Sequence, residues 1–464
     1  MNLEDIHRIK SVYMIGIGGI GMSALARYFL SRGKKVSGYD RVSTRLTDDL
    51  AREGSEIHFT ADLSYIRENF PDPQEGIVIY TPAVPEDHLE LQYFRKGGYR
   101  IVKRAEMLGV LSKDADCIAV AGTHGKTTIT TLIAHLLKVA GIPCTAFLGG
   151  ISKNYGTNAI LSGEGVWMVL EADEFDRSFL NLFPRMAVVS SCDPDHLDVY
   201  GTKEKMEEAY CRFIGQIRPG GKLVHHGGLT LPCLDSTSLA RLTYGLEKPA
   251  MCCAENVRRK EGRYLFDAVI GERWIPDLEL GIPGRINIEN ALAAIGVGML
   301  LELGEDAIRE ALSTFNGVKR RFDVQILRDD LIYIDDYAHH PKELEACIRS
   351  VRDNYPGKRI TGVFQPHLYT RTRDFADEFA ESLSTLDELI LLPIYPAREE
   401  PIEGVTPEMI LDKVRQPNKI LVGKEQLLQV LGERNPQVLL TLGAGDIDQF
   451  VEPIVNLYSK ERAI

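Results

Sequence analysis

The ten residues AVAGTHGKTT at positions 119–128 decide how the middle of this chain folds. The apolar run 117–121 predicts a buried strand, which breaks at Gly122 and turns through Gly125 into a helix that begins at Lys126. A turn of this kind directs successive backbone N–H groups and a helix N-terminus at one point, and so forms a cradle for an anion. The stretch therefore predicts a strand, a phosphate-binding turn and a helix in direct succession.

Two side chains of this turn suit a nucleotide. Lys126 offers a mobile positive charge to the terminal phosphates, and the hydroxyl of Thr127 is a ligand for Mg²⁺. The turn is shorter than the G-x-x-x-x-G-K-[ST] phosphate loop, because Val120 stands where that pattern has its first glycine. Apolar residues at helical spacing follow it, at positions 132, 133, 136 and 137, as in an amphipathic helix. The residues expected to bind the nucleotide are Gly122, Thr123, His124, Gly125, Lys126, Thr127 and Thr128.

Length, charge and composition limit what the chain can be. Its 464 residues are too many for one hydrophobic core, and about two to four domains are expected. The net charge of −12 argues against a nucleic-acid partner, because phosphates require a basic face. No apolar run approaches the roughly 18 residues that span a bilayer, so we expect no membrane insertion. The N-terminus lacks the basic and apolar regions of a signal peptide, and we expect a cytoplasmic protein.

The eight cysteines contain no C-x-x-C pair. Cys117 and Cys192 lie inside apolar runs and are expected to be small core residues. We therefore expect free thiols, with neither a disulfide framework nor a zinc site.

Residues 11–40 predict the start of a strand–helix–strand unit. Its expected elements are a strand at 12–15, the turn GIGGIG at 16–21, a helix at 22–31 and a strand at 35–40. Glycines let the backbone approach a pyrophosphate, and Asp40 is placed for a ribose hydroxyl. Taken alone, the pattern fits a dinucleotide site or a purely structural tight turn. A further strand at 76–80 ends at Thr81, at the kind of edge where open α/β sheets bind ligands.

Acidic and histidine residues follow two other expected strands of the middle part. EADEFD at 171–176 follows a strand at 166–170, and DPDHLD at 193–198 follows a strand at 186–190. Carboxylates and an imidazole there would complete the coordination of Mg²⁺, although histidine is an unusual ligand for this ion. The same residues also suit solvated loops and helix N-caps. The segment 223–275 is expected to be rich in strands and turns.

The last third begins near Phe315 and alternates expected strands with helices. The strands are expected at 332–336, 360–364, 388–392 and 438–441. DDYAHHP at 335–341 suits either a metal site or a capped helix start. QPHLYTRTR at 365–373 offers two arginines to a carboxylate or a phosphate. The whole chain thus predicts three consecutive α/β units with parallel sheets.

Taken in order, these segments resemble the Mur ligase family of ATP-dependent amide-forming enzymes. More narrowly, they resemble the branch that joins L-alanine to UDP-N-acetylmuramate in peptidoglycan precursor synthesis. Eight motifs in one order are far more specific than any single one. They are GIGGIGMS at 16–23, AGTHGKTT at 121–128, EADEFDRSFL at 171–180, DPDHLD at 193–198, GRINIENALAA at 284–294, KRRFD at 319–323, DDYAHHP at 335–341 and FQPHLYTRT at 364–372.

The resemblance implies an α/β fold of three domains. It implies a Rossmann-like domain at 1–108 that binds the UDP-sugar, and a central P-loop domain at 109–314, with a mostly parallel sheet, that binds ATP. A Rossmann-like C-terminal domain at 315–464 would bind the amino acid and close on ATP. The first glycine turn would then hold UDP rather than NAD. The residues implied for the UDP-sugar are Gly18, Gly19, Met22, Asp40, Thr81, Ala83 and Arg104.

The resemblance also implies a two-step reaction that uses ATP and Mg²⁺. The lactyl carboxylate takes the γ-phosphoryl group of ATP, and the amine of L-alanine then displaces phosphate from the acyl phosphate through a tetrahedral intermediate. Such chemistry depends on positioning and on neutralisation of charge. The residues implied as catalytic are Lys126, Glu171, His196, Arg321 and His339. Those implied for Mg²⁺ are Thr127, Glu171 and His196.

The same motif match assigns the remaining ligand contacts. Asn287 and Asn290 would contact adenine, and Arg321 and Asp336 would bring ATP and the third domain together. The residues implied to surround the alanine and the reacting carboxyl are His124, Tyr337, His339 and Arg371, with His339 as proton acceptor. One departure is Leu368, where several relatives have arginine, so that the alanine carboxylate would depend on Arg371 alone.

Three alternatives stay open at this point. The nearest is a recycling ligase that attaches a whole tripeptide to the same UDP-sugar, but its first glycine loop follows GxCGTxM where this chain has GIGGIGM. A nicotinamide-dependent dehydrogenase would leave the phosphate loop and both acidic segments unexplained. A non-catalytic nucleotide-binding regulator would bind ATP without substrate-dependent release of ADP. The sequence leaves a monomer and a dimer equally open.

Overall fold

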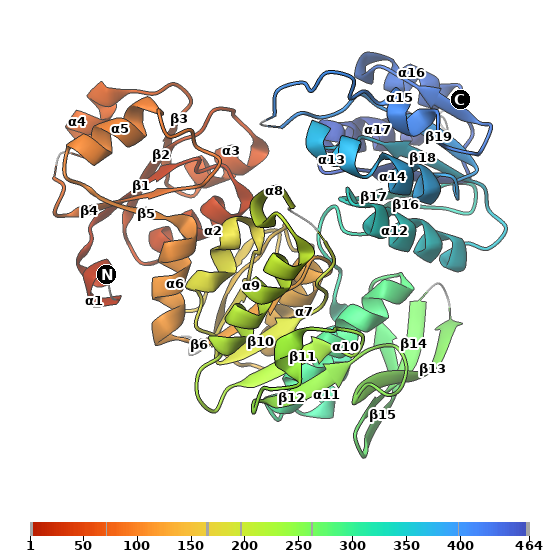
Figure 1. Cartoon of the computed structure of the whole chain (residues 1–464), viewed down its shortest axis with the longest axis horizontal. Helices are drawn as coiled ribbons and strands as arrows, with labels where there is room; N and C mark the ends of the chain where they lie inside the picture. Colours follow the sequence, from red (N-terminus) through yellow and green to blue (C-terminus); the bar gives the residue numbers. More distant parts are fainter. Residues whose placement is uncertain are drawn as a thin grey trace. The chain divides into compact units, whose positions relative to one another are not determined.

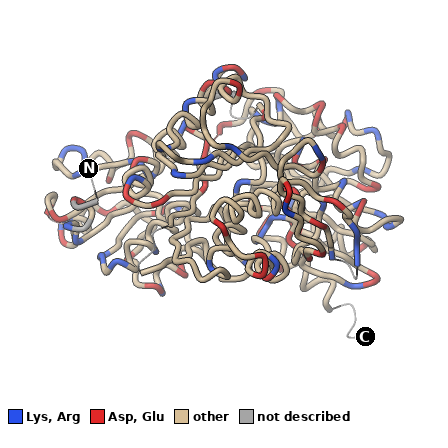
Figure 2. The backbone as a smooth tube through the Cα atoms, turned by 90° about the horizontal axis from the view of Figure 1, so that it is seen from below, with Lys and Arg blue, Asp and Glu red and all other residues tan. Residues whose placement is uncertain are grey.

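The computed structural model describes residues 3–70, 72–163, 167–194, 197–260, 263–397 and 399–460. It contains three β-sheets in sequence order (Figure 1). The chain divides into two compact units. The first unit, Met1–Arg259 with Leu265–Gly281 and Ile288–Asn316, holds the first two sheets, and the second unit, Gly317–Ile464 with two short segments, holds the third. Figure 2 shows basic and acidic residues interspersed along the backbone.

The first sheet is parallel and has β1 at its centre. Its strands, in spatial order, are β3 (Glu56–His58), β2 (Lys35–Tyr39), β1 (Ser11–Ile15), β4 (Gly76–Tyr80) and β5 (Arg100–Lys103). Helices α2 (Ile20–Ser31) and α6 (Arg104–Asp114) pack on one face, and α4 (Leu63–Asn69) and α5 (Leu89–Lys96) pack on the other. The strand order changes direction between β1 and β4, which is where such sheets bind ligands.

The second sheet has ten strands, and β6 lies between two neighbours that also end in polar residues. In spatial order the strands are β15 (Arg273–Leu280), β14 (Arg263–Ile270), β13 (Cys252–Lys260), β12 (Ala240–Tyr244), β11 (Lys222–His226), β10 (Met186–Val189), β6 (Asp116–Ala121), β9 (Trp167–Glu171), β7 (Cys144–Phe147) and β8 (Ala159–Ile160). β6 pairs in parallel with β9 and with β10. The segment 223–275 is strand-rich as predicted and supplies much of β11 to β15.

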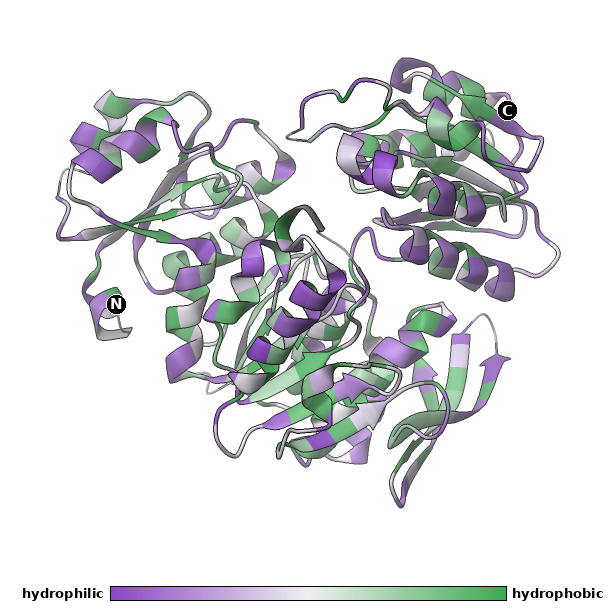
Figure 3. Ribbon diagram, in the orientation of Figure 1, coloured by the Kyte–Doolittle hydropathy of each residue, from purple (hydrophilic) through white to green (hydrophobic). Residues whose placement is uncertain are grey.

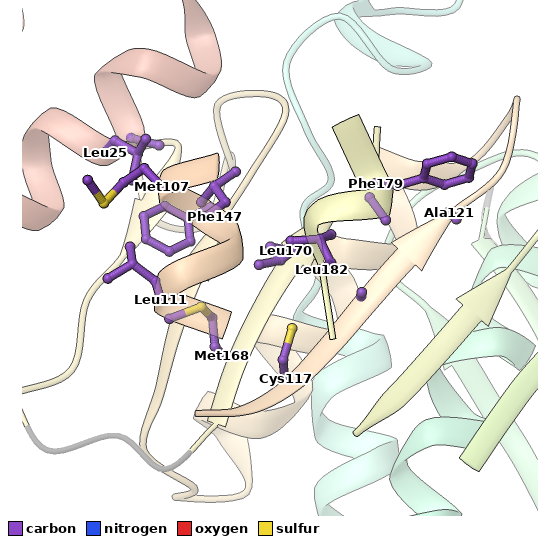
Figure 4. Packing of buried hydrophobic residues seen from close by; sticks show 14 of the residues in the cluster. Leu25, Met107, Leu111, Cys117, Ala121, Phe147, Met168, Leu170, Phe179 and Leu182 are labelled. Atoms are coloured by element: carbon purple, nitrogen blue, oxygen red, sulfur yellow. The ribbon is translucent and has the colours of Figure 1, made fainter. Parts of the chain in front are cut away.

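One continuous hydrophobic cluster joins the first two sheets, which explains why they form a single unit. It contains Val12 and Met14 of β1, residues of α2 and α6, and every second residue of β6 (Cys117, Ala119, Ala121). Figure 4 shows Leu25 of α2 and Met107 and Leu111 of α6 near Phe147 and Met168. The alternation along β6 follows from the two-residue period of a strand. Figure 3 shows hydrophobic colours along the strands and mixed faces on the helices.

The third sheet confirms the α/β expectation and adds one antiparallel edge strand. In spatial order its strands are β16 (Asp323–Leu327), β17 (Ile332–Asp336), β21 (Val438–Leu442), β18 (Ile360–Phe364), β19 (Glu388–Leu391) and β20 (Lys419–Leu421). Only the pairing of β16 with β17 is antiparallel among these described strands. Helices α12 (Pro341–Asn354) and α14 (Ala376–Leu383) pack on one face, and α16 (Leu427–Gly432) and α17 (Val451–Lys460) on the other.

The cysteine expectation is wrong for one pair. Cys211, on α9 (Lys203–Gly215), forms a disulfide with Cys233, and their Cα atoms lie 5.5 Å apart. The two residues are 22 positions apart and carry no spacing motif, so only the packing of α9 against the turn Pro232–Leu234 brings them together. The other six cysteines are free thiols, as expected. Among the described residues no helix is both long enough and apolar enough to cross a membrane.

Helix α7 (Lys126–Val139), which begins at the phosphate loop, is fixed at its middle by the buried His135. The ring atom Nδ1 lies 2.6 Å from the Tyr155 hydroxyl, and Nε2 lies 3.0 Å from Thr314 Oγ1. Burial, with a smaller effect of Lys138, lowers the pKa of His135 to about 4. The neutral imidazole is therefore the form that the fold holds.

Because His135 is buried in its neutral form, we predict that the protein becomes less stable as the pH is lowered. Below an unfolded pKa of about 6.5, the unfolded chain binds a proton that folded His135 does not bind until about pH 4. The free energy of unfolding should therefore decrease from pH 6.5 towards pH 4, by at most about 1.4 kcal/mol per pH unit from this group. Urea unfolding at pH 7.5 and 5.5 checks this, with His135→Gln as the variant and His88→Gln as control. Equal pH dependence in wild type and His135→Gln would contradict it.

Candidate active site

The phosphate loop leaves β6 through two glycines that no other residue can replace without strain. Gly122 has φ 136° and Gly125 has φ 80°, both in the left-handed region that favours glycine. A Cβ on Gly122 would collide with Ser190 Oγ and lie 2.8 Å from the backbone nitrogen of Ser191. A Cβ on Gly125 would lie 2.7 Å from Oδ1 of Asn290. Asn290, predicted to contact adenine, is thus placed directly against the loop.

The residues that follow β10 hold this loop in place. Thr123 Oγ1 lies 2.9 Å from Ser191 Oγ, which also accepts a hydrogen bond from the backbone N–H of His124 at 2.9 Å. The backbone N–H of Asp193 donates to Thr123 Oγ1 at 3.1 Å, and Asp193 Oδ2 lies 3.2 Å from Nε2 of His124. Neither Ser190 nor Ser191 was predicted, although two consecutive serines at the end of the expected strand 186–190 were an available indication. His196, predicted as a catalytic residue and metal ligand, lies outside the described residues.

Lys126 forms a buried ion pair with Glu174. Its Nζ lies 2.8 Å from both Oε1 and Oε2 of Glu174 and 2.6 Å from the backbone oxygen of Gly122. Burial lowers the pKa of Lys126, but the nearby carboxylates of Glu174, Asp173 and Glu171 outweigh it, and the net shift is upward. Lys126 is therefore a firmly protonated ammonium group.

Glu171 and Thr127 are oxygen donors that suit Mg²⁺. Glu171 ends β9, and its Oε1 accepts a hydrogen bond from the backbone N–H of Gly149 at 2.9 Å. A Cβ on Gly149 would collide with this carboxylate, so the glycine leaves room for it. Within the described ranges no three His, Cys, Asp or Glu side chains cluster as a metal site. Mg²⁺ needs few protein ligands and prefers oxygen, so a carboxylate and a hydroxyl fit this ion.

The first glycine turn brings its predicted residues together at the carboxyl ends of β1, β2 and β4. The backbone N–H of Gly18 donates to Asp40 Oδ2 at 2.7 Å. Gly19 is the N-cap of α2, and the methyl group of Thr81 packs against Gly16. The Met22 side chain is buried in the core, so only its backbone is available at the turn. Ala83 is exposed.

Arg104 lies between the first glycine turn and the acidic segment after β9. A Cβ on Gly21 would collide with its guanidinium, so the arginine packs directly on the turn. Its Nη2 lies 3.4 Å from Asp173 Oδ2, and the neighbouring Lys103 donates to Asp176 at 3.0 Å. Asp173 and Asp176, for which the sequence left a metal site and a solvated loop open, therefore form ion pairs with basic residues.

In the second unit, both arginines of the KRRFD motif lie over one tyrosine ring. The guanidinium carbons of Arg320 and Arg321 are each 4.9 Å from the centre of the Tyr337 ring. Asp336 accepts backbone hydrogen bonds from Phe322 at 2.6 Å and Ala338 at 2.8 Å. Burial raises the pKa of Asp336 to about 6, and the positive charge of Arg321 opposes the shift.

A second cluster of the same unit gathers His339, His367 and Arg371. His339 Nδ1 lies 3.0 Å from the backbone oxygen of Tyr337 and 3.2 Å from Glu343 Oε2. The rings of His339 and His367 are 6.0 Å apart, and Nη1 of Arg371 lies 3.4 Å from His367 Nδ1. Glu343, four positions after His339 on the first turn of α12, was not predicted from the sequence.

One histidine of the DDYAHHP segment caps a helix. Helix α12 begins at Pro341, and the His340 ring accepts a hydrogen bond from the N–H of Lys342, so the capped helix start is correct for this histidine. Leu368 has φ 72°, which is unusual for a leucine, and directly precedes the helix that carries Arg371. Asn287, the other predicted adenine contact, is buried and donates from Nδ2 to the Pro283 oxygen at 2.6 Å.

Three family models match consecutive parts of the chain. The model described as "Mur ligase family, catalytic domain" matches residues 11–115, "Mur ligase middle domain" matches 120–298, and "Mur ligase, glutamate ligase domain" matches 320–445. Together these matches cover most of the chain and follow the order of its three sheets.

Relatives match over almost the whole length. UDP-N-acetylmuramate–L-alanine ligase of Parabacteroides distasonis is 50% identical over 457 residues, which are 98% of this chain and 99% of that protein. The crystal structure of UDP-N-acetylmuramate-alanine ligase from Thermotoga maritima is 27% identical with a TM-score of 0.82, and the match covers 97% of this chain and all of that one. A murein peptide ligase from Psychrobacter arcticus, 20% identical, shares the fold with a TM-score of 0.70 over 98% of this chain and 100% of that one.

The geometry of the loop predicts the effect of one methyl group. Gly125→Ala should abolish nucleotide binding, because its Cβ would displace Asn290 and the residue would resist φ 80°. Gly141→Ala is the matched control, since Gly141 has φ 71° and open space at its Cβ. Both changes cost about 1–2 kcal/mol of backbone strain. Binding of a fluorescent ATP analogue measures the nucleotide affinity, and thermal unfolding measures the loss of stability that both variants share. Wild-type affinity in Gly125→Ala would contradict this view of the loop.

Proposed function

The chain belongs to the Mur ligase family, and we propose that it joins L-alanine to the lactyl carboxylate of UDP-N-acetylmuramate, with conversion of ATP to ADP and phosphate. The observation that carries this proposal is the end-to-end match, at 50% identity, to a ligase named for these two substrates. The phosphate loop supports it, because Lys126, Asn290 and the two glycines of positive φ meet there. We also propose that the reaction, a step of peptidoglycan precursor synthesis, takes place in the cytoplasm.

The first step is transfer of the γ-phosphoryl group to the carboxylate. A carboxylate oxygen bonds to the γ-phosphorus, the bond from this phosphorus to the bridging oxygen breaks, and ADP leaves with that oxygen. Loop N–H groups and Lys126 neutralise the charge that spreads over the phosphate oxygens. Thr127, Glu171 and His196 would hold Mg²⁺, which neutralises further phosphate charge and orients the phosphate when bound.

Other residues position ATP and the sugar nucleotide. Asn287 and Asn290 would contact adenine, and Arg321 and Asp336 would contact ATP from the second unit. Gly18, Gly19 and Asp40 would hold the UDP moiety, with Thr81, Ala83 and Arg104 nearby. The assignments rest on the motifs, and the hydrogen bond between Gly18 and Asp40 shows that these two residues lie side by side.

The second step is attack of the alanine amine on the acyl carbon, after which phosphate leaves. The backbone oxygen of Tyr337 lies 3.0 Å from His339 Nδ1 and fixes the proton on that atom, so that Nε2 carries the lone pair that a base requires. Glu343, 3.2 Å from Nδ1, stabilises the imidazolium that forms when Nε2 takes the amine proton. The buried Arg371 would bind the alanine carboxylate, since Leu368 offers no charge.

The proposal predicts strict substrate dependence. Phosphate release with ATP and Mg²⁺ should require both UDP-N-acetylmuramate and L-alanine, because the acyl phosphate forms on the sugar nucleotide and is consumed by the amine. Glycine, L-serine and the tripeptide L-alanyl-γ-D-glutamyl-meso-diaminopimelate are the comparison amines. Release with the tripeptide alone would assign the recycling reaction instead, and release with none of the amines would refute the catalytic proposal.

Arg321 gives a test of the second unit. Arg321→Ala should abolish turnover and leave UDP-N-acetylmuramate affinity unchanged, because the arginine is proposed to act on ATP only. Arg349→Ala is the control, since Arg349 is an exposed residue of α12 that pairs with Glu345. Calorimetry with the UDP-sugar and phosphate release give the two readouts. Loss of UDP-sugar affinity in a folded Arg321→Ala variant would show that this arginine has another role.

A further inference from the structure

The phosphate-loop lysine already uses every hydrogen bond that it can donate. A lysine ammonium has three N–H donors. Here Nζ meets three acceptors, which are the Gly122 oxygen at 2.6 Å and both carboxylate oxygens of Glu174 at 2.8 Å. Under the proposed function Lys126 must donate to the terminal phosphates of ATP. At least one of these bonds has to break before it can do so.

The backbone of Glu174 is anchored beside its buried side chain. Its side chain is 1% exposed, and its backbone oxygen accepts hydrogen bonds from the Tyr200 hydroxyl at 2.6 Å and from the N–H of Arg177 at 3.0 Å. Asp173 before it and Asp176 after it are paired with Arg104 and Lys103. Lys126 has a long flexible side chain. We therefore expect the lysine to move when the pair opens.

None of the proposed roles uses Glu174. The carboxylate assigned to Mg²⁺ is that of Glu171, which ends β9 and accepts a hydrogen bond from Gly149. Burial nevertheless raises the pKa of Glu174, so its ionised form depends on the neighbouring lysine. A buried carboxylate that faces the phosphate-binding cation is the arrangement of a counter-ion.

We propose that Glu174 is a positioning residue that takes the place of the ATP phosphates at Lys126 while the loop is empty. Binding of ATP moves Lys126 from the Glu174 carboxylate to the phosphates, and release of ADP lets the pair re-form. The inference rests on the proposed function, because it needs ATP as the ligand of this loop.

The energetics set the direction of the effect. Removal of one partner from a buried ion pair is costly, because the other charge stays buried and uncompensated. When Lys126 moves to ATP, the Glu174 carboxylate stays buried without its partner. This cost weakens ATP binding and favours release of ADP. Glu174→Gln is isosteric and removes this penalty. The same change deprives Lys126 of its counter-ion in the empty protein, so the empty variant should be less stable.

The test is calorimetric binding of MgATP to wild type, Glu174→Gln and a matched control. Asp176→Asn is the control, because it removes one carboxylate charge from the same segment but from a pair with Lys103. We expect roughly tenfold tighter ATP binding in Glu174→Gln, since no charge is left unpaired. The control should bind ATP as wild type does. The variant should also show lower KM for ATP, lower kcat from slower ADP release, and a lower unfolding temperature without nucleotide.

Three outcomes would overturn the proposal. Unchanged or weaker ATP binding in a Glu174→Gln variant that still binds the UDP-sugar would mean that Glu174 does not compete with phosphate. Equally tighter ATP binding in Asp176→Asn would mean that the loss of any negative charge from this segment is sufficient. Absence of ATP binding to wild type would refute the proposed function itself, and this inference with it. If Glu174→Gln does not fold, Glu174→Asp replaces it, because the shorter carboxylate cannot reach Nζ with both oxygens. An affinity for ATP no tighter than that of wild type would then overturn the proposal.

Discussion

The turn from β6 into α7 is the constraint on which the rest of the first unit depends. A buried strand ends there at Ala121, and the chain must reverse through Gly122 and Gly125 before a helix can begin at Lys126. Both glycines have a positive φ, and a side chain on either one would meet a neighbour. Because β9 and β10 flank β6 in parallel, their carboxyl ends open onto the same edge. Glu171 and the serines after β10 therefore lie beside the loop as a consequence of strand order.

The acidic segment after β9 links the two proposed nucleotide sites of the first unit. Asp173 lies against Arg104, which packs on the first glycine turn, and Glu174 lies against Lys126 in the phosphate loop. A continuous hydrophobic core under both sheets keeps this segment in place. The fold thus connects the proposed UDP-sugar turn to the proposed ATP lysine through two consecutive carboxylates, with no long loop between them.

The sequence predicted the elements well because buried parallel strands are short apolar runs that end at polar residues. β1, β4, β6 and four strands of the third sheet (β17, β18, β19 and β21) lie where these runs lie, whereas its edge strands β16 and β20 were not predicted. Helix α2 begins two residues before its predicted start at Met22. Contacts between distant segments were not predictable in this way. The ion pair of Lys126 with Glu174 and the disulfide of Cys211 with Cys233 depend on packing that no local spacing encodes. The same holds for the serines after β10, whose hydrogen bonds reach a loop about 70 positions earlier in the chain.

The central claim is that the sugar-nucleotide carboxylate is activated by phosphoryl transfer and then attacked by alanine. The most direct measurement uses UDP-N-acetylmuramate with both lactyl carboxylate oxygens labelled with ¹⁸O. The phosphate released in the presence of ATP and L-alanine is then analysed by mass spectrometry. The account predicts that each phosphate carries one ¹⁸O atom, because the oxygen that bonds to phosphorus leaves with it when the amide forms. Unlabelled phosphate, formed together with the amide product, would contradict the account.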